Sequence, residues 1–317
     1  MAQTDDIITL ELGRYRLLEP IAGSAYGLVW RASGPSGSGD VALKLVNAAQ
    51  MERAAPALRA RWVQSAQAEI AFLQSLEPWD ECHIVRLLDS GWHQGLPVQA
   101  LELLGQDLAR HSAACGAPPL PRALAWMRQL NQALAKVHQY GWRYLDLKPA
   151  NVLVDPWLDR VKLADFGTSR RLASLEPHSY CGTAQWQAPE QFFPAAGGGY
   201  ATGTHSDYFA LGALLFYVVT GGQSPAYCAE CGDAYRGRLA DGAADLLARH
   251  GGLPATLQPL DEDRFAAALP VAALDPALAL LRALLAPAPA DRPRNALHIS
   301  RLLDAIPYSE GPCLRAA

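Results

Sequence analysis

The 317-residue sequence predicts an α+β fold in two parts, with β-strands first and helices in most of the remainder. Three runs with strand patterns lie before Gly105, at residues 14–30, 41–46 and 98–104. After Gly105 the apolar residues recur mainly at helical spacing, most clearly over residues 121–140. The length is sufficient for two lobes or domains, and the boundary between them is predicted near Gly105.

The composition is that of a globular protein with a large core, because half of the residues are hydrophobic and 18% are charged. A net charge of −4 argues against a general nucleic-acid binder and against a basic protein of membrane surfaces. The most apolar stretch, residues 208–219, is too short to span a bilayer and is predicted to be a buried core helix. Residues 1–13 carry early acidic residues and no apolar core of signal-peptide length, so we expect a cytoplasmic chain.

The first predicted element, residues 14–30, alternates as a strand and then turns at small residues, among them Ser24 and Gly27. A turn of small residues brings backbone N–H groups close to phosphate oxygens without obstruction by side chains. Taken alone, the pattern favours an ordinary β-hairpin.

The strand Val41–Val46 contains one lysine, Lys44, among apolar residues. Such a lysine costs free energy unless its ammonium meets an anion or points to solvent from an edge strand. Residues 57–76 follow with helical periodicity and place Glu69 on the inward side. A pair between Lys44 and Glu69 is therefore predicted.

The stretch from Tyr144 to Val154 places an acid, an ammonium and a carboxamide within six residues, at Asp146, Lys148 and Asn151. Asp165-Phe166-Gly167 begins fourteen residues after the last of these. Phosphoryl transfer from a nucleotide needs these parts in this order. One carboxylate orients the attacking hydroxyl, the lysine neutralises the moving phosphoryl group, and the amide and second carboxylate hold magnesium.

These two motifs resemble the H-R-D-x-x-x-x-N and D-F-G patterns of the eukaryotic-type (Hanks-type) serine/threonine protein kinase family. Further along, Cys181–Glu190 resembles the family's G-T-x-x-[YW]-x-A-P-E segment, and Ser206–Gly212 its S-D-x-[WF]-[AS]-L-G helix start. Arg292 matches the late arginine that pairs with the A-P-E glutamate, so a buried ion pair with Glu190 is predicted. Because the motifs occur in the family's order over residues 14–305, the resemblance covers nearly the whole chain.

The resemblance implies the bilobal protein-kinase fold, with a small antiparallel β-sheet and one main helix in the N-lobe and a larger, mostly helical C-lobe. The lobes would comprise residues 14–104 and 105–307, between tails at 1–13 and 308–317. The alanine-rich composition favours a bacterial member of the family.

The resemblance also implies ATP as the phosphoryl donor, Mg²⁺ or alternatively Mn²⁺ as the metal, and a protein as the substrate. Asp146, Lys148, Asn151 and Lys44 would be the catalytic residues, with Asn151 and Asp165 holding the metal. Glu69 would orient Lys44 toward the phosphates, and Leu101 would stand at the gatekeeper position beside the adenine. The implied ATP-binding set is Ala22, Gly23, Ser24, Gly27, Val29, Ala42, Lys44, Glu69, Leu101, Glu102, Leu104, Leu153 and Asp165.

Four positions depart from the family pattern. Tyr144 replaces the H-R-D histidine and is expected to be a packing variant. Leu145 replaces the arginine (a non-RD type) and cannot bind a phosphorylated activation segment, so phosphorylation by this route is predicted to be unnecessary. Ala22 and Ser24 replace two loop glycines and are expected to raise the KM for ATP. Lys148 and Thr183 are typical of the serine/threonine subtype.

Two other functions remain open. A pseudokinase scaffold would bind nucleotide or partners without turnover. A small-molecule phosphotransferase of the aminoglycoside type would share the lobes and the Asp-to-Asn loop, but such enzymes generally lack the A-P-E segment and the late arginine.

Residues 223–275 carry little family signal, so this region is a candidate for specialised substrate docking. It contains Cys228 and Cys231, whose spacing predicts either half of a zinc site or two thiols in a loop.

Overall fold

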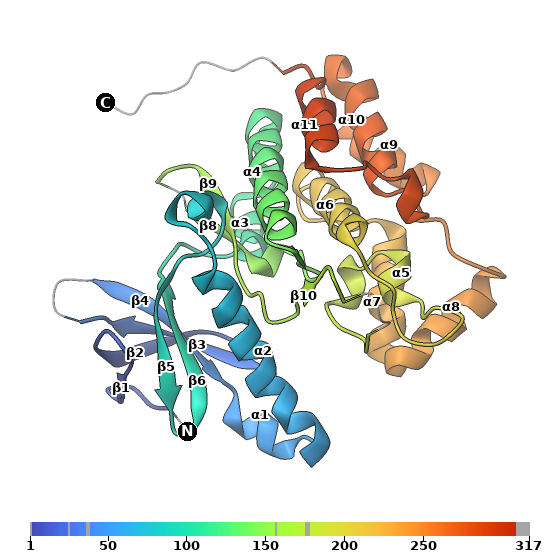
Figure 1. Cartoon of the computed structure of the whole chain (residues 1–317). Helices are drawn as coiled ribbons and strands as arrows, with labels where there is room; N and C mark the ends of the chain where they lie inside the picture. Colours follow the sequence, from blue (N-terminus) through green and yellow to red (C-terminus); the bar gives the residue numbers. More distant parts are fainter. Residues whose placement is uncertain (1, 25, 36–38, 156, 175–177, 309–317) are drawn as a thin grey trace, which may run out of the picture. The chain divides into compact units, whose positions relative to one another are not determined.

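The computed structural model describes residues 2–24, 26–35, 39–155, 157–174 and 178–308. The chain divides into two compact units, which Figure 1 shows coloured along the sequence. The small unit comprises residues 1–105 with 164–167, and the large unit comprises residues 106–163 with 168–317. The division after Gly105 lies next to the boundary predicted between residues 104 and 105. Residues 164–167 join the small unit although the prediction had placed them in the C-lobe.

The small unit is built on a six-stranded sheet in the order β1-β2-β3-β4-β6-β5, in which every neighbouring pair is antiparallel. Alternate side chains, among them Leu17, Trp30 and Leu43, form the buried core of the sheet. The strands are β1 (Ile7–Thr9), β2 (Arg14–Gly23), β3 (Gly27–Ser33), β4 (Asp40–Val46), β5 (Leu87–His93) and β6 (Leu96–Glu102).

Strand β1 lies in the segment that the sequence assigned to an N-terminal tail. Ile8 is fully buried in the sheet core, and Leu10 is 7% exposed. The backbone N–H of Leu12 and the hydroxyl of Tyr15 both donate to the buried carboxylate of Asp89, at 3.0 and 2.9 Å. A three-residue strand depends on these partners along the chain, so its own sequence carries too weak a pattern to predict it.

Helices of the small unit follow β4. They are α1 (Ala48–Arg53), α2 (Pro56–Gln74) and the 3₁₀-helix η1 (Pro78–His83). Helix α2 confirms the predicted helix over residues 57–76, and a proline at its first position favours its start. It packs against β4, β5 and β6 (Figure 1) through Glu69, Phe72 and Leu73, each at most 2% exposed.

The large unit is mostly helical, with two small two-stranded sheets. Its α-helices are α3 (Leu108–Cys115), α4 (Leu120–Gln139), α5 (Pro189–Phe192), α6 (Thr204–Val219), α7 (Ala226–Arg238), α8 (Gly242–His250), α9 (Pro259–Ala267), α10 (Val271–Leu284) and α11 (Ala296–Asp304). Its 3₁₀-helices are η2 (Pro149–Asn151), η3 (Ala184–Trp186), η4 (Leu239–Asp241) and η5 (Pro289–Asp291). The sheets pair β7 (Trp142–Arg143) with β10 (Arg170–Arg171), and β8 (Val152–Asp155) with β9 (Arg160–Leu163).

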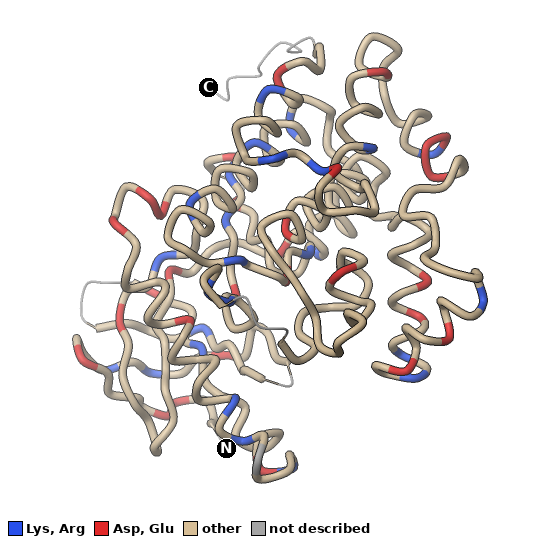
Figure 2. Tube along the Cα trace, turned by 45° about the vertical axis from the view of Figure 1, so that its right-hand side comes forward, with Lys and Arg blue, Asp and Glu red and all other residues tan. Residues whose placement is uncertain are grey.

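Helix α6 is the centre of the large unit, and almost all of its residues are buried. This confirms the core helix that the apolar run at residues 208–219 predicted. Gly212 permits the close approach of α10, because a Cβ at this position would lie 2.7 Å from the Cβ of Leu284. In the described residues, no helix combines the length and the apolar composition that a membrane span requires. Figure 2 shows basic residues interspersed with acidic ones along both units.

Cys228 and Cys231 lie on helix α7, which corrects their predicted placement in a loop. Their three-residue spacing puts both thiols on one helical face, and both residues are fully buried. Burial raises the pKa of both thiols, that of Cys231 to about 12, so both stay protonated. The part of the chain that the structure describes contains no group of three or more His, Cys, Asp or Glu residues suited to hold a metal ion.

Candidate active site

The ammonium of Lys44 on β4 is enclosed by carboxylates within the small unit. Its Nζ donates to both carboxylate oxygens of Glu69, at 2.8 and 2.7 Å, and to Oδ1 of Asp165 at 2.8 Å. Burial alone would lower the pKa of Lys44, but the charges of Asp165 and Glu69 outweigh it and raise the pKa above its ordinary value. The predicted pair with Glu69 is therefore present. Because β4 lies between β3 and β6, the solvent-facing edge lysine is excluded.

Glu69 accepts two further hydrogen bonds besides those from the lysine. The side-chain amide of Gln99 donates to Oε2 at 3.1 Å, and the backbone N–H of Phe166 donates to Oε1 at 2.8 Å. Gln99 lies on β6 directly opposite Lys44 and is 2% exposed. The sequence interpretation missed it, although a glutamine inside an apolar strand is a signal. Four hydrogen bonds fix the orientation of the Glu69 carboxylate.

The Asp165-Phe166-Gly167 segment is held by side chains of helix α2. The ring of Phe166 lies 4.7 Å from that of Phe72, and the Ser65 hydroxyl donates to the carbonyl of Gly167. Asp165 adopts a φ of 60°, in the left-handed region that costs free energy for residues other than glycine. Its contact with Lys44 and the packing of Phe166 maintain this conformation.

Between β2 and β3, the turn bonds its own backbone through Ser24. The Ser24 Oγ accepts from the N–H groups of Gly27 and Tyr26, at 3.1 and 3.2 Å. The Ser24 N–H donates to the carbonyl of Gly27 at 2.8 Å. These three N–H groups thus have partners inside the turn. Ala22 and Gly23, at the end of β2, are exposed.

The residues predicted around the adenine fall on four strands and on the segment after β6. In the small unit, Ala42 on β4 lies opposite Leu101 on β6, and both are buried. Val29 on β3 lies opposite Lys44. The remaining three predicted residues are Glu102, whose N–H donates to the carbonyl of Arg86 at 3.0 Å, Leu104 in the segment after β6, and Leu153 on β8 of the large unit.

Asp146 is the centre of a hydrogen-bonded cluster in the large unit, where it is 7% exposed. Its Oδ2 accepts from Lys148 Nζ at 2.8 Å and from Asn151 Nδ2 at 3.0 Å. Its Oδ1 accepts from the hydroxyl of Thr183 at 2.8 Å. Lys148 Nζ also donates to the Thr183 hydroxyl oxygen, at 2.7 Å. The cluster joins the three catalytic-loop residues predicted from sequence and adds Thr183, which the sequence had marked only as typical of the subtype.

Asp207 of helix α6 holds the backbone before Asp146. Its carboxylate accepts from the N–H groups of Tyr144 and Leu145, at 2.8 and 2.7 Å, and lies 2.8 Å from His138 Nε2. Leu145 has a φ of 68°, which is strained for leucine. Because Asp207 binds both neighbouring N–H groups, this conformation is maintained.

Glu190 and Arg292 form the buried ion pair that the sequence predicted. The guanidinium donates to both carboxylate oxygens at 2.8 and 2.9 Å, and the arginine side chain is fully buried. It also donates to the carbonyls of His205, Ala286 and Pro287. A bidentate pair with every donor direction used is suited to fix the end of the activation segment.

The predicted metal ligands, Asn151 and Asp165, belong to different units. The amide nitrogen of Asn151 donates to both the carbonyl and the carboxylate of Asp146, which leaves its carbonyl oxygen for a cation. The Asp165 side chain stays 46% exposed although it bonds Lys44. A carboxamide oxygen and a carboxylate oxygen are the ligand types that Mg²⁺ prefers. The chemistry of the two side chains therefore fits such a metal.

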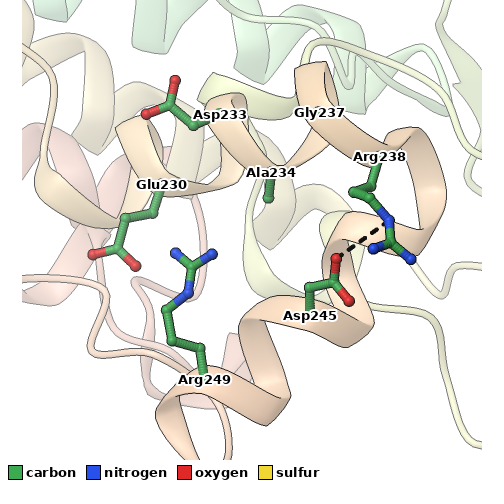
Figure 3. Close-up of a pocket in the computed structure, with 7 residues that line it drawn as sticks. All are labelled: Glu230, Asp233, Ala234, Gly237, Arg238, Asp245 and Arg249. Carbon is green, nitrogen blue, oxygen red and sulfur yellow. Dashed lines mark ion pairs between the residues drawn. The ribbon is translucent and has the colours of Figure 1, made fainter.

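A hollow of about 230 Å³ lies between α7 and α8, in the region with little family signal. Figure 3 shows charged side chains of both helices around it, including an ion pair of 3.5 Å between Arg238 and Asp245. The charged groups around it are exposed for the most part. None of the residues predicted for catalysis lines this hollow.

Comparisons with known proteins agree with this geometry. Residues 15–299 match the protein kinase domain family. Over 221 residues the chain is 28% identical to a ribosomal protein S6 kinase beta of Caenorhabditis elegans. The match covers 68% of the chain and 38% of that protein. It is 30% identical to the serine/threonine-protein kinase PrkC of Bacillus subtilis, over 66% of the chain and 31% of the relative. It is 29% identical to the serine/threonine-protein kinase pkn2 of Myxococcus xanthus, over 66% of the chain and 24% of the relative.

The matches thus span about a quarter to two fifths of the length of these curated relatives. The predicted bacterial membership has similar proteins in Bacillus subtilis and Myxococcus xanthus, beside the eukaryotic relative.

Proposed function

Because the chain belongs to the Hanks-type serine/threonine branch of the protein kinase family, we propose that it transfers the γ-phosphate of ATP to serine and threonine hydroxyls of a protein substrate. The observation that carries this proposal is the hydrogen bond of 2.8 Å from the Thr183 hydroxyl to Asp146. An alcohol already donates to the carboxylate, with the ammonium of Lys148 2.7 Å from the same alcohol oxygen. A substrate hydroxyl would need the same two partners.

When bound, ATP supplies the phosphoryl group, and a divalent metal ion neutralises the charge that develops on it. Asp146 orients the substrate hydroxyl and accepts its proton. Lys148 neutralises the oxygens of the transferred group, and Lys44, oriented by Glu69, binds the α- and β-phosphates. Asn151 and Asp165 would hold Mg²⁺, with Mn²⁺ as the alternative.

The other predicted residues bind the nucleotide through backbone groups and apolar contact. Backbone groups of Glu102 and Leu104 bond the edge of the adenine, beside Leu101 at the gatekeeper position. Small or apolar side chains contact the base, and the turn between β2 and β3 covers the phosphates. The two sets are Val29, Ala42 and Leu153 for the base, and Ala22, Gly23, Ser24 and Gly27 for the phosphates.

A kinase assay separates this proposal from a pseudokinase scaffold. The purified chain is incubated with Mg²⁺, radiolabelled ATP and a generic protein substrate, beside Asp146→Asn and Lys44→Met. We expect labelling of substrate by the wild type and a loss of at least about a hundredfold in each variant. This is the lower end of general acid–base contributions for Asp146 and of electrostatic stabilisation for Lys44. Equal labelling by wild type and Asp146→Asn would show that the chain does not act as an enzyme.

The same assay with an aminoglycoside as acceptor tests the small-molecule alternative. The Glu190–Arg292 pair supports a protein substrate, because it fixes an activation segment that small-molecule phosphotransferases generally lack. We expect phosphorylation of protein and none of the aminoglycoside. Preferential labelling of the aminoglycoside would refute the protein-kinase proposal.

A further inference from the structure

The turn between β2 and β3 is attached to the start of helix α1. Asn47 caps α1, where its Oδ1 accepts from the N–H of Gln50 at 3.3 Å. The same residue donates its side-chain amide to the carbonyl of Ser24 at 2.9 Å and its backbone N–H to the carbonyl of Tyr26 at 3.0 Å. One asparagine thus binds both the helix and the turn.

A second attachment joins the turn to helix α2. The ring of Tyr26 lies 5.0 Å from that of Trp62, at an interplanar angle of 38°. Tyr26 is 63% exposed, so general burial does not explain its position. An aromatic contact of this geometry contributes free energy beyond the area that it buries. We name the contacts of Tyr26 with Asn47 and Trp62 the loop latch.

Trp62 lies on the same face of α2 as the residues that hold Lys44 and the D-F-G segment. Residues three, four or seven positions apart on a helix share a face, as Trp62, Ser65, Glu69 and Phe72 do. Ser65 donates to the carbonyl of Gly167, and the ring of Phe72 packs against that of Phe166. One face of α2 therefore contacts the turn at one end and the D-F-G segment at the other.

We propose that Trp62 is a positioning residue, which through Tyr26 fixes the phosphate-binding turn relative to Lys44 and Glu69 before nucleotide binds. The inference rests on the proposed ATP binding and goes beyond it, because it assigns a role to residues without any place in the predicted site. A turn fixed in advance loses less conformational entropy when a ligand binds. With glycines at positions 22 and 24, contacts with the nucleotide would have to order the turn. In this chain the loop latch orders the turn before the nucleotide binds.

The first test measures the equilibrium dissociation constant for ATP by calorimetry. We expect Tyr26→Ala and Trp62→Ala each to raise it about 2- to 12-fold, the range for one aromatic pair. The double variant should raise it no further than the larger single effect, because both changes remove one contact. Tyr26→Phe and Trp62→Phe keep a ring and should stay within about twofold of wild type. Trp79→Ala, at a tryptophan 75% exposed on η1, is the matched control and should change nothing.

The kinetic readout separates positioning from a merely structural role. The KM for ATP should rise in parallel with the dissociation constant, whereas kcat at saturating ATP stays within about twofold. The latch would be refuted if neither alanine variant weakened ATP binding, if the effects of the pair multiplied, or if Trp79→Ala weakened binding equally.

Hydrogen exchange without nucleotide keeps this test apart from the proposed function. Amides of the β2–β3 turn should exchange faster in Trp62→Ala than in wild type. A wild type that bound no ATP would refute the proposed function but leave this readout intact. Unchanged exchange in a folded variant would refute the latch, and faster exchange with unchanged ATP affinity would refute its positioning role.

Discussion

Replacing Glu69 by glutamine tests whether the buried carboxylate, rather than packing alone, stabilises the small unit. The glutamine has nearly the same volume but no charge and only one acceptor oxygen. The wild-type carboxylate is 1% exposed and accepts four hydrogen bonds, two from Lys44 and one each from Gln99 and Phe166. The new amide group would place N–H donors against the donors of Lys44 and Gln99.

The expected loss of folding free energy in Glu69→Gln follows from the surroundings of Lys44 in the variant. The Lys44 side chain is 17% exposed in the wild type, and in the variant its ammonium keeps Asp165 as its carboxylate partner. Removing one member of a buried ion pair costs about 3–5 kcal/mol when the other charge is left buried without a partner. Because Asp165 still compensates part of the Lys44 charge, the lower end of this range applies. We expect the free energy of unfolding to fall by this amount.

Urea denaturation, followed by a probe in the small unit, measures the change. Asp165→Asn is the matched control, because it removes the other carboxylate from Lys44 with a similar change in shape. The Asp165 side chain is 46% exposed, so its pair should contribute no more than about 1 kcal/mol. If Glu69→Gln cost less than about 1 kcal/mol, or no more than Asp165→Asn, the reasoning from burial would be refuted.

The pH dependence of the lysine has a defined sign. The folded-state pKa of Lys44 is raised above its unfolded value, so its charge contributes fully below about pH 10.4 and less as the pH rises further. The difference between wild type and Glu69→Gln should therefore persist across neutral pH.

Four further outcomes are expected. Thr183→Ala should lower kcat about tenfold, because it removes one hydrogen bond to the charged Asp146. Thr183→Ser keeps the hydroxyl and should have a kcat within about threefold of the wild type. Equal rates in the wild type and the alanine variant would refute a role of Thr183. Arg292→Met should lower the free energy of unfolding by about 3–5 kcal/mol in urea, against at most about 1 kcal/mol for the exposed control Arg282→Met. Burial lowers the pKa of His178. Its neutral form therefore contributes stability above about pH 6.5 that is lost as the pH falls, and wild-type thermal stability should decline more from pH 7.5 to 5.5 than that of His178→Gln. Phosphatase treatment should leave kinase activity within about twofold because Leu145 cannot bind a phosphate, and a larger loss would contradict this.

Features that depend on charge chemistry were the most predictable from the sequence. A lysine in a buried strand requires an anion, so its partner Glu69 could be sought in the helical region that follows the strand. A late arginine likewise requires an acid, which Glu190 supplies. The twelve-residue apolar run at 208–219 needs burial on all sides, and α6 has it.

Features that depend on contacts distant in sequence were less predictable. Strand β1 has three residues and becomes a strand only through its register with β2 and its neighbours in the core. Gln99 acts through Glu69, thirty residues away, and has no motif of its own. Cys228 and Cys231 have a spacing shared by metal sites and helix faces, and only the surrounding helix decides between them.

The departures from the family motif differ in effect because the structure uses the backbone at some positions and the side chain at others. At Tyr144 and Leu145, Asp207 binds the backbone N–H groups, which every residue except proline provides. Replacing the histidine and the arginine therefore leaves the support of the catalytic loop unchanged. At Ser24 the new side chain itself accepts two backbone N–H groups of the turn, which a glycine would leave for a ligand. The same kind of substitution is thus neutral for the geometry of the catalytic loop but alters the hydrogen bonding of the phosphate-binding turn, and ATP affinity rather than kcat should report the difference.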